Sequence, residues 1–266
     1  MADVSVIIPC YNGAEFVGQA IGSVLAQTDP VREVIVIDDG STDDSAKVIK
    51  QFADRHVVLI EQDHQGESHA RNKGIERASS ELIALLDADD VWTHDKVKQQ
   101  VQALEAMPEA VAVHSRVFNF ERDLDDRQRE QTEKTKDDPD VSDLLAYHYV
   151  TPSTLMVRRS VLVEHSIEFD PSVRHSEDML FTAHLRLAGP LRLVDQPLTA
   201  KRIHGGQQSS DRWHPIWSLC SRVNWCRQYA QKIGPDTAKN IDQQLGDRMI
   251  QILEDRFWRR EIGGLT

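Results

Sequence analysis

The sequence contains little cysteine and few basic residues. Its three cysteines, Cys10, Cys220 and Cys226, show no CxxC spacing, and an odd number suits a reducing compartment better than a disulfide framework. We expect Cys10 to be a packed thiol and assign no metal to the cysteines. Lys and Arg number 31 against 43 Asp and Glu, which gives a net charge of -12. Because nucleic-acid binding needs clustered basic side chains, this charge argues against a nucleic-acid partner.

Long apolar runs and glycine-rich phosphate loops are also missing. No run approaches the roughly 18 apolar residues of a transmembrane helix, and the first residues lack the features of a signal peptide. We therefore expect a cytoplasmic protein, with peripheral contact at the inner face of a membrane as an alternative. Neither GxGxxG after the first apolar run nor GxxxxGK[ST] occurs, so a bound nucleotide would need a metal ion to neutralise its diphosphate.

The first half of the chain alternates between two patterns. Four runs have the apolar, β-branched character of buried strands: residues 4–8, 34–37, 57–60 and 82–86. Between them lie stretches with helical spacing of apolar residues: 14–27, a segment beginning near Asp43, and 67–79. Strands that are continuously apolar and separated by helices predict an α/β fold, with a mostly parallel sheet covered by helices on both faces.

The second half is more mixed. Residues 121–140 are nearly all polar and are interpreted as a mobile loop, either a solvated excursion or a lid over a site. A strand entering a helix is expected within 154–162, and a further helix within 168–189. Residues 207–266 are helical in character, with Trp213, Trp217 and Trp225 spaced four and eight apart.

Acidic residues follow an apolar run in "ELIALLDADDVW", residues 81–92. One interpretation of Asp87, Asp89 and Asp90 is a solvated strand end that caps the next helix, through Asp90 or Thr93. The other is a site for a divalent cation, which prefers oxygen ligands. Polar groups also follow the first and second strands, and ligands of parallel sheets bind outside the carboxyl ends of the strands.

Four sequence blocks, taken together, are similar to those of one enzyme family. "VSVIIPCYNGAEFV", "VIDDGSTDDS", "ARNKGIERASSELIALLDADD" and "SEDMLF" resemble the inverting, nucleotide-sugar-dependent glycosyltransferases of family 2, which have the GT-A fold, a Rossmann-like sheet. The resemblance covers roughly residues 3–205. It implies a catalytic domain at 1–206, with a nucleotide-sugar half at about 1–115 and an acceptor half at about 116–206. A C-terminal helical extension would then occupy 207–266.

The resemblance implies a nucleotide site. Pro9 and Tyr11 would lie under the base, and Asp39 would accept a hydrogen bond from the ring NH of uracil. Arg71 would face the nucleotide, and Arg202 would touch the diphosphate or the metal. Simpler roles stay open: a helix cap for Asp39, packing for Tyr11, and an ion pair for Arg71.

A metal site follows from the same resemblance. Asp87, Ala88 and Asp89 match the family's DxD motif, in which Asp89 would bind Mn²⁺ or Mg²⁺ directly and Asp87 would bond ribose or complete the metal shell. His204 is two residues from Arg202, on the same side of an extended segment, and would join the metal site; the alternative is a surface histidine.

The resemblance assigns the general base to Asp178. Its neighbour Glu177 would point about 100° away on a helix and cannot share that task. The implied activity moves a hexose or N-acetylhexosamine, with inversion, from a UDP-sugar to a hydroxyl of a glycan or lipid-linked glycan. Synthesis of bacterial surface polysaccharide is the expected setting, while the sugar and the acceptor stay undetermined.

The sequence leaves open two rival functions and two roles for the C-terminal extension. The chain could be a catalytically silent relative that only binds UDP, or a phosphoryl-receiver domain with Lys201 as its required lysine. In the extension, Trp213, Ile216 and Trp217 are expected to pack on the catalytic domain or on a second subunit, which would make a homodimer. Residues 257–260, Phe-Trp-Arg-Arg, could instead rest on a membrane interface, which the acidic net charge disfavours.

Overall fold

The computed structural model describes residues 2–52, 56–121, 135–147, 150–173, 175–204 and 214–258. Its strands are β1 (Ala2–Cys10), β2 (Val31–Asp38), β3 (Val57–Glu61), β4 (Leu82–Leu85), β5 (Val91–Trp92), β6 (Ala112–Phe120), β7 (Met156–Arg158) and β8 (Leu191–Arg202). Its helices are α1 (Val17–Leu25), α2 (Ser45–Lys50), α3 (Glu67–Arg77), α4 (Lys96–Ala106), α5 (Val141–Ala146), α6 (Arg159–Glu164), α7 (Glu177–Ala188), α8 (His214–Gln228), α9 (Ala230–Ile233) and α10 (Pro235–Trp258). A 3₁₀ turn, η1 (Pro152–Thr154), precedes β7.

The described strands form one sheet of eight, in the order β3-β2-β1-β4-β7-β6-β8-β5. β1 pairs in parallel with β2 and β4, β2 with β3, and β6 with β8, while β7 and β5 run antiparallel to their neighbours. The predicted mostly parallel sheet is therefore confirmed. Because β1, β2 and β4 are parallel, the polar residues after them meet at one edge of the sheet.

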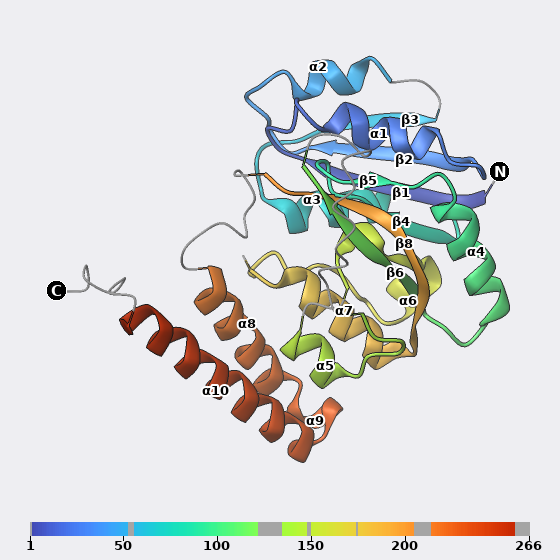
Figure 1. Ribbon diagram of the computed structural model, residues 1–266. Helices are drawn as coiled ribbons and strands as arrows, with labels where there is room; N and C mark the ends of the chain where they lie inside the picture. Colours follow the sequence, from blue (N-terminus) through green and yellow to red (C-terminus); the bar gives the residue numbers. More distant parts are fainter. Residues whose placement is uncertain are drawn as a thin grey trace.

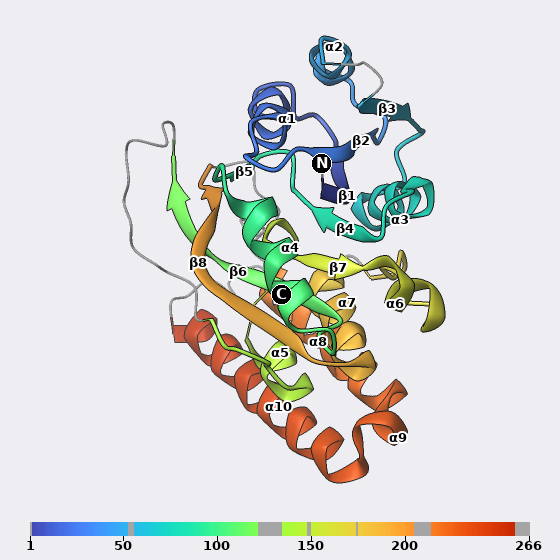
Figure 2. The same cartoon turned by 90° about the vertical axis from the view of Figure 1, so that its right-hand side faces the viewer.

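Both faces of the sheet are covered by helices. Successive residues of β1 point to opposite faces: Ile8 packs in a core with residues of α1 and α4, and Ile7 packs in a second core with residues of α3 and α7. Figures 1 and 2 show α1 and α3 on opposite sides of the sheet. The four apolar runs of the first half are continuous because each strand faces two cores.

The C-terminal helices pack on α7 rather than on the sheet. Their buried side chains form a third cluster with α5 and α7: Leu145, Leu180, Ala183, Leu219, Trp225, Cys226, Ile241 and Leu245. In Figure 1, α8 and α10 lie side by side, to the left of α5 and α7. The predicted helical extension is confirmed. Within the described residues, no helix is long and apolar enough to cross a membrane.

The tryptophans of the extension differ from the expectation. Trp217 is 57% exposed and does not pack on the catalytic domain. Trp225 is the buried one: its indole N–H donates to His184 of α7 at 2.9 Å, and its ring stacks on Tyr229. Trp213, the side chain of Ile216 and the side chains of 257–260 lie outside what the structure describes. The prediction that Trp217 packs on the catalytic domain is therefore wrong, and its packing on a second subunit stays a prediction.

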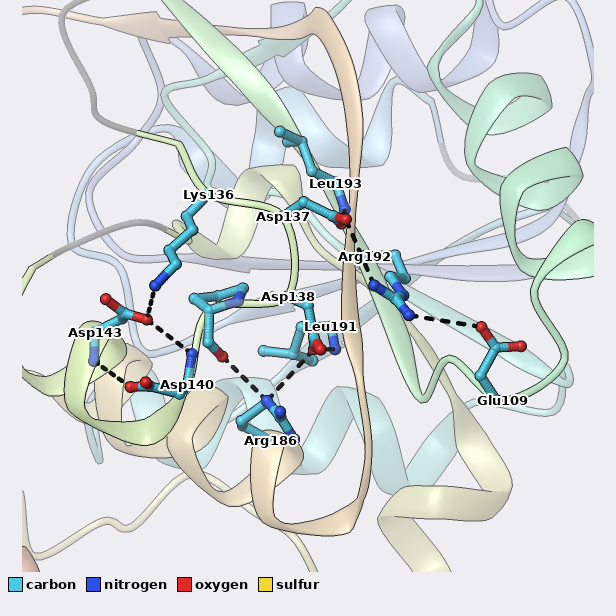
Figure 3. Close-up of polar contacts among 11 residues, drawn as sticks. Glu109, Lys136, Asp137, Asp138, Asp140, Asp143, Arg186, Leu191, Arg192 and Leu193 are labelled. Carbon is cyan, nitrogen blue, oxygen red and sulfur yellow. Dashed lines mark hydrogen bonds and ion pairs between the residues drawn. The ribbon is translucent and has the colours of Figure 1, made fainter. Parts of the chain in front are cut away.

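The polar segment 121–140 is held in place at its C-terminal end, which corrects the prediction of a mobile loop there. Asp137 and Asp138 accept hydrogen bonds from the backbone N–H groups of Leu193 and Leu191 in β8, at 3.0 and 3.1 Å (Figure 3). Asp140 and Asp143 then form a reciprocal cap at the start of α5. The acidic residues that suggested a solvated loop bind backbone donors instead; residues 122–134 lie outside the described ranges.

Helix α4 begins with a buried lysine. Lys96, the first residue of α4, has no exposed surface, contacts Gln100, and lies 4.2 Å from the centroid of the Trp92 ring. Burial lowers the pKa of its amine well below the usual value. The unfolded chain binds a proton on this residue below about pH 10.4, and the folded chain binds it only at a lower pH. The free energy of unfolding therefore decreases as the pH falls through this window.

We expect Lys96→Met to stabilise the protein at pH 7, because methionine fills the same space without an amine to desolvate. A rise in Tm of about 3 °C or more is expected, since roughly 2–4 °C corresponds to 1 kcal/mol in a chain of this size. The difference should shrink as the pH approaches 10. Thermal unfolding of this variant and of the control Lys98→Met, at an exposed position of the same helix, measures it; a drop in Tm at pH 7 would contradict the burial argument.

Candidate active site

The loops after β1 and β2 are tied together by hydrogen bonds. The N–H of Asn12 donates to the Ser41 hydroxyl at 2.9 Å, and the Asn12 side-chain oxygen accepts from the N–H of Thr42 at 2.8 Å. Gly40, which directly precedes Ser41, has φ +73°. A Cβ there would lie 2.7 Å from the backbone nitrogen of His64, so only glycine fits. The "YNG" and "DDGST" motifs thus form one rigid corner.

This corner presents a ring and a carboxylate. Tyr11 is 48% exposed and stacks on His64, with ring centroids 4.0 Å apart, while Pro9 is buried in β1. The buried Asp39 accepts from the backbone N–H groups of Gln65 and Gly66, at 2.9 and 2.8 Å. Its carboxylate therefore fixes the turn that leads into α3, and does not cap α2.

Asp39 has two further partners on the same turn. Its Oδ1 accepts from the Gln62 amide at 2.6 Å, and Nδ1 of His64 lies 2.9 Å from its Oδ2. The His64 side chain is 53% exposed. Protein donors thus already surround this carboxylate, and a nucleobase would have to displace one of them.

The three aspartates after β4 differ in environment. Asp90 is buried and accepts from the Ser153 hydroxyl at 2.6 Å and from the N–H of Arg202 at 3.0 Å. Burial, with Asp87 and Asp89 nearby, raises its pKa well above the usual value. Asp90 therefore anchors the loop and does not cap α4, which corrects that alternative; Thr93 does not cap it either, since the N-cap is Asp95, which makes no side-chain cap bond.

Asp87 and Asp89 remain partly exposed, at 26% and 30%. Asp87 Oδ1 accepts from Arg71 at 2.8 Å, and Asp89 Oδ2 lies 2.9 Å from Nε2 of His204. Ala88 between them packs against the core beneath α1. The loop thus directs its two outer carboxylates to different partners.

Arg202 holds the loop that carries Asp87 and Asp89. Its guanidinium is sandwiched between the rings of Phe16 and Phe120, at 4.8 and 4.4 Å, and its Nε donates to the carbonyl oxygen of Asp89 at 2.9 Å. The residue is buried. As predicted from the extended segment, it lies on the same side as His204, whose ring also contacts Phe16.

Arg71 is the buried cation at the centre of the acidic site. It pairs with Glu67 at 2.5 Å, with Asp87 at 2.8 Å and with Glu177 at 3.5 Å, and it lies 5.0 Å from the centroid of the Phe169 ring. Burial acts to lower the pKa of the guanidinium, but these carboxylates raise it above its usual value. The ion-pair alternative is thus the arrangement found, in the interior rather than at the surface.

Helix α3 holds this cation close to the sheet. Gly74, one turn after Arg71, has no room for a side chain, because a Cβ there would lie 2.3 Å from Cγ2 of Ile7 in β1. The backbone of α3 therefore approaches β1 as closely as atoms allow.

The start of α7 brings two more carboxylates. Glu177 contacts Arg71, whereas Asp178 Oδ1 accepts from the N–H of Met179 at 2.7 Å. Burial and then Asp178 raise the pKa of Glu177 to about 8, with Arg71 opposing. Burial also raises the pKa of Glu67 to about 7, opposed by Arg71 and assisted by Asp87 and Asp178. The carboxylates of α3, the DxD loop and α7 therefore form one electrostatic cluster.

The metal assignment is tested by the donors present. Within the described residues, no group of three or more His, Cys, Asp and Glu side chains could hold a metal ion by itself. The pair of Asp89 and His204, at 2.9 Å, offers one carboxylate oxygen and one imidazole nitrogen, both partly exposed. Mg²⁺ and Mn²⁺ bind through few protein ligands when substrate phosphates and waters complete the shell. The residues fit a metal that arrives with its nucleotide.

Several residues of the site carried no recognised motif. Glu67 and Ser153 contact the predicted aspartates or arginine, while His64 stacks on Tyr11. Glu67 had a readable signal, since it lies four residues before Arg71 on a helix. Ser153 had none, because its contact with Asp90 spans 63 residues.

The chain is similar in sequence and in fold to known proteins. A glycosyltransferase of Nostoc sp. is 32% identical over 213 residues, 76% of this chain and 65% of that protein. The UDP-Glc:alpha-D-GlcNAc-diphosphoundecaprenol beta-1,3-glucosyltransferase WfgD of Escherichia coli is 35% identical over 102 residues, 38% of this chain and 40% of that protein. The matched segments thus span less than two thirds of these relatives.

The fold likeness extends further along the chain. The crystal structure of S. aureus TarS 1-349 in complex with UDP-GlcNAc has a TM-score of 0.73 and 20% identity, and covers 94% of this chain and 73% of that one. This likeness agrees with the GT-A fold implied by the sequence blocks. The family model described as Glycosyl transferase family 2 matches residues 5–165, which is more than half of the 266-residue chain. The chain therefore belongs to glycosyl transferase family 2.

Proposed function

We propose that this protein is a metal-dependent, inverting hexosyltransferase. It moves a hexose or N-acetylhexosamine from a UDP-sugar to a hydroxyl of a glycan or lipid-linked glycan. The observation that carries the proposal is that Asp39, Asp89 and Asp178 lie around the start of α3: Asp39 accepts from the N–H of Gly66, and Asp89 and Asp178 both raise the pKa of Glu67. Within it, we keep the division into a nucleotide-sugar half at about 1–115, an acceptor half at about 116–206 and an extension at 207–266.

The corner of Tyr11 and Asp39 suits a nucleobase. An exposed aromatic ring offers a stacking surface, and the buried carboxylate beside it would accept the ring N–H of uracil in place of the Gln62 or His64 side chain. The similarity to the UDP-Glc glucosyltransferase WfgD and to TarS in complex with UDP-GlcNAc supports a UDP-sugar as the donor. Arg71 would hold Asp87 toward the ribose, and Arg202 would hold the loop on which Asp89 lies.

The charge of the site supports a metal cofactor. The two guanidinium groups beside the DxD loop, Arg71 and Arg202, are both buried and held by protein partners, while Asp87 and Asp89 are partly exposed. A diphosphate brought to this site would be repelled unless a cation accompanied it. Asp89 and His204, with Asp87 nearby, would hold Mn²⁺ or Mg²⁺. When bound, the ion would neutralise the diphosphate and stabilise the UDP leaving group.

Asp178 would act as the general base. Its carboxylate would take the proton of the acceptor hydroxyl as that oxygen attacks the anomeric carbon. Attack opposite to the bond that breaks inverts the configuration, and UDP departs with the bonding electrons. Glu177, whose contact is with Arg71, would hold the first turn of α7 rather than accept this proton.

The remaining assignments concern the surroundings of the enzyme. The expected setting is bacterial surface polysaccharide synthesis in the cytoplasm, at the inner face of the membrane when the acceptor is lipid-linked. Exposed Trp217 and Ile250, at 57% and 56% on the C-terminal helices, support a homodimer there. Membership of the family removes the phosphoryl-receiver alternative, and the filled acidic positions argue against a silent UDP-binding relative.

Thermal unfolding with nucleotides tests the donor assignment. UDP with Mn²⁺ at 100 times its Kd should stabilise the protein by about 2.7 kcal/mol, roughly 5–10 °C in Tm, and ADP with Mn²⁺ should do less. Hydrolysis of UDP-glucose, UDP-galactose and their N-acetyl forms should then identify the sugar. Stabilisation without hydrolysis of any of them would favour the silent relative, and equal stabilisation by ADP would overturn the uridine assignment.

A further inference from the structure

The helix that carries Asp178 begins with an unusual backbone conformation. Ser176, its N-cap residue, has φ +71° and ψ +19°, in the left-handed region that favours glycine. A residue with a Cβ is strained there, because the Cβ lies too close to the following carbonyl oxygen. Its hydroxyl makes no cap bond within α7. A further contact is therefore needed to keep Ser176 in this conformation. Without it, relief of the strain would favour a rearrangement of the first turn of α7.

That contact comes from the C-terminal extension. The Ser176 and Ser218 hydroxyls are 2.5 Å apart, both residues are buried, and Ser218 lies on α8, 42 residues later. Arg222, one turn further along α8, donates to the carbonyl oxygens of Ser218 and Leu145, at 3.2 and 2.7 Å. The hydroxyl of Ser218 is thus presented by a helix that is itself anchored to α5.

The first turn of α7 is therefore held from two sides. On the side of the sheet, Glu177 pairs with Arg71; on the side of the extension, Ser176 meets Ser218. Asp178 is the next residue, and its direction follows from the backbone of this turn. A change of a few tenths of an ångström at Ser176 would be passed directly to the Asp178 carboxylate.

From these contacts we infer that Ser218 is a positioning residue for the reaction: the C-terminal extension holds Ser176 in its left-handed conformation and so aims Asp178 at the acceptor hydroxyl. The inference rests on the proposed function of Asp178. It assigns the extension a part in catalysis beyond packing. The proposed donor site lies on the opposite side of Arg71 from Ser176. The affinity for UDP should therefore not depend on the contact between Ser176 and Ser218.

Ser218→Ala tests the inference. The rate of UDP-sugar hydrolysis at saturating donor, measured with the UDP-sugar that the wild type hydrolyses fastest, should fall about tenfold, since a misplacement of roughly 1 Å can cost 10²-fold. The Kd of UDP with Mn²⁺, measured by calorimetry, should stay within about twofold. Cys220→Ser, at an exposed position of the same helix, should change neither quantity.

Two double variants separate positioning from packing. Ser176→Gly with Ser218→Ala should recover most of the rate, because glycine adopts positive φ without help. Ser176→Ala with Ser218→Ala removes the same hydroxyl but disfavours positive φ, and should stay slow. Equal rates for these two variants, or an unchanged rate for Ser218→Ala alone, would overturn the inference.

Hydrogen exchange gives a readout that does not need activity. Ser218→Ala should speed amide exchange in a peptide spanning 176–184, and Ser176→Gly should restore protection. If exchange there is unchanged, the inference is wrong whatever the enzyme does. If the wild type hydrolyses none of the UDP-sugars while exchange behaves as expected, the proposed function fails and the structural link between α8 and α7 stands.

Discussion

Asp178→Asn should slow sugar transfer by roughly 10²- to 10⁴-fold, which is the usual contribution of a positioned general base. Asparagine is nearly the same size and can still hydrogen-bond an acceptor hydroxyl, but it cannot accept the proton at neutral pH. UDP binding should persist, because Asp39 and Asp89 lie on other elements. The measurement pairs calorimetric UDP affinity with the rate of UDP-sugar turnover.

Glu177→Gln is the matched control for this variant. The Glu177 side chain contacts Arg71, and glutamine has the same size and keeps an oxygen that can accept a hydrogen bond from that guanidinium. A loss of a few fold is expected at most. Near wild-type turnover by Asp178→Asn, or loss of its UDP binding, would show that Asp178 is not the base.

Asp89→Asn should abolish metal-dependent turnover and leave the fold intact. The substitution removes the exposed carboxylate that faces His204, so the metal keeps one protein ligand of the pair. Asp89 also contributes to the raised pKa values of Asp90 and Glu67. Removing its charge relieves this repulsion, and we expect an unchanged or slightly higher Tm without metal.

The readout for Asp89→Asn should include binding as well as turnover. Calorimetric titration of UDP in the presence and absence of Mn²⁺ should show that the metal no longer increases UDP affinity. Asp44→Asn, a change at an exposed position after β2, should behave as the wild type. Full Mn²⁺-dependent turnover by Asp89→Asn would rule out the DxD loop as the metal site.

The strands and helices of the first half could be predicted because their signals are local. Each of β1, β2 and β4 contains an apolar run, and a polar residue follows each strand within two positions and marks the sheet edge. β8 gave no such signal, because Asp195 and Pro197 interrupt it where its register with β6 shifts. The acidic run before α5 was misread for a related reason: its partners are backbone groups more than 50 residues away.

The sequence could predict which residues belong to the site, but not the contacts between them. The resemblance implies roles for Asp39, Asp89 and Asp178 that stay predictions, and the structure places the three residues around the start of α3. The partners of Arg71 and Arg202 could not be read from the sequence, because one guanidinium binds side chains of three elements and the other is enclosed by two rings. Contacts of this kind depend on the packing of distant segments.

The close approach of α3 to β1 limits how this active site can change. Since a side chain at Gly74 would collide with Ile7, the sizes of these two residues are linked. A larger residue at 74 would be tolerated only with a smaller one at 7, and until both changed Arg71 would keep its depth. The position of the buried cation Arg71 is therefore tied to the sizes of two residues that lie outside the acidic cluster.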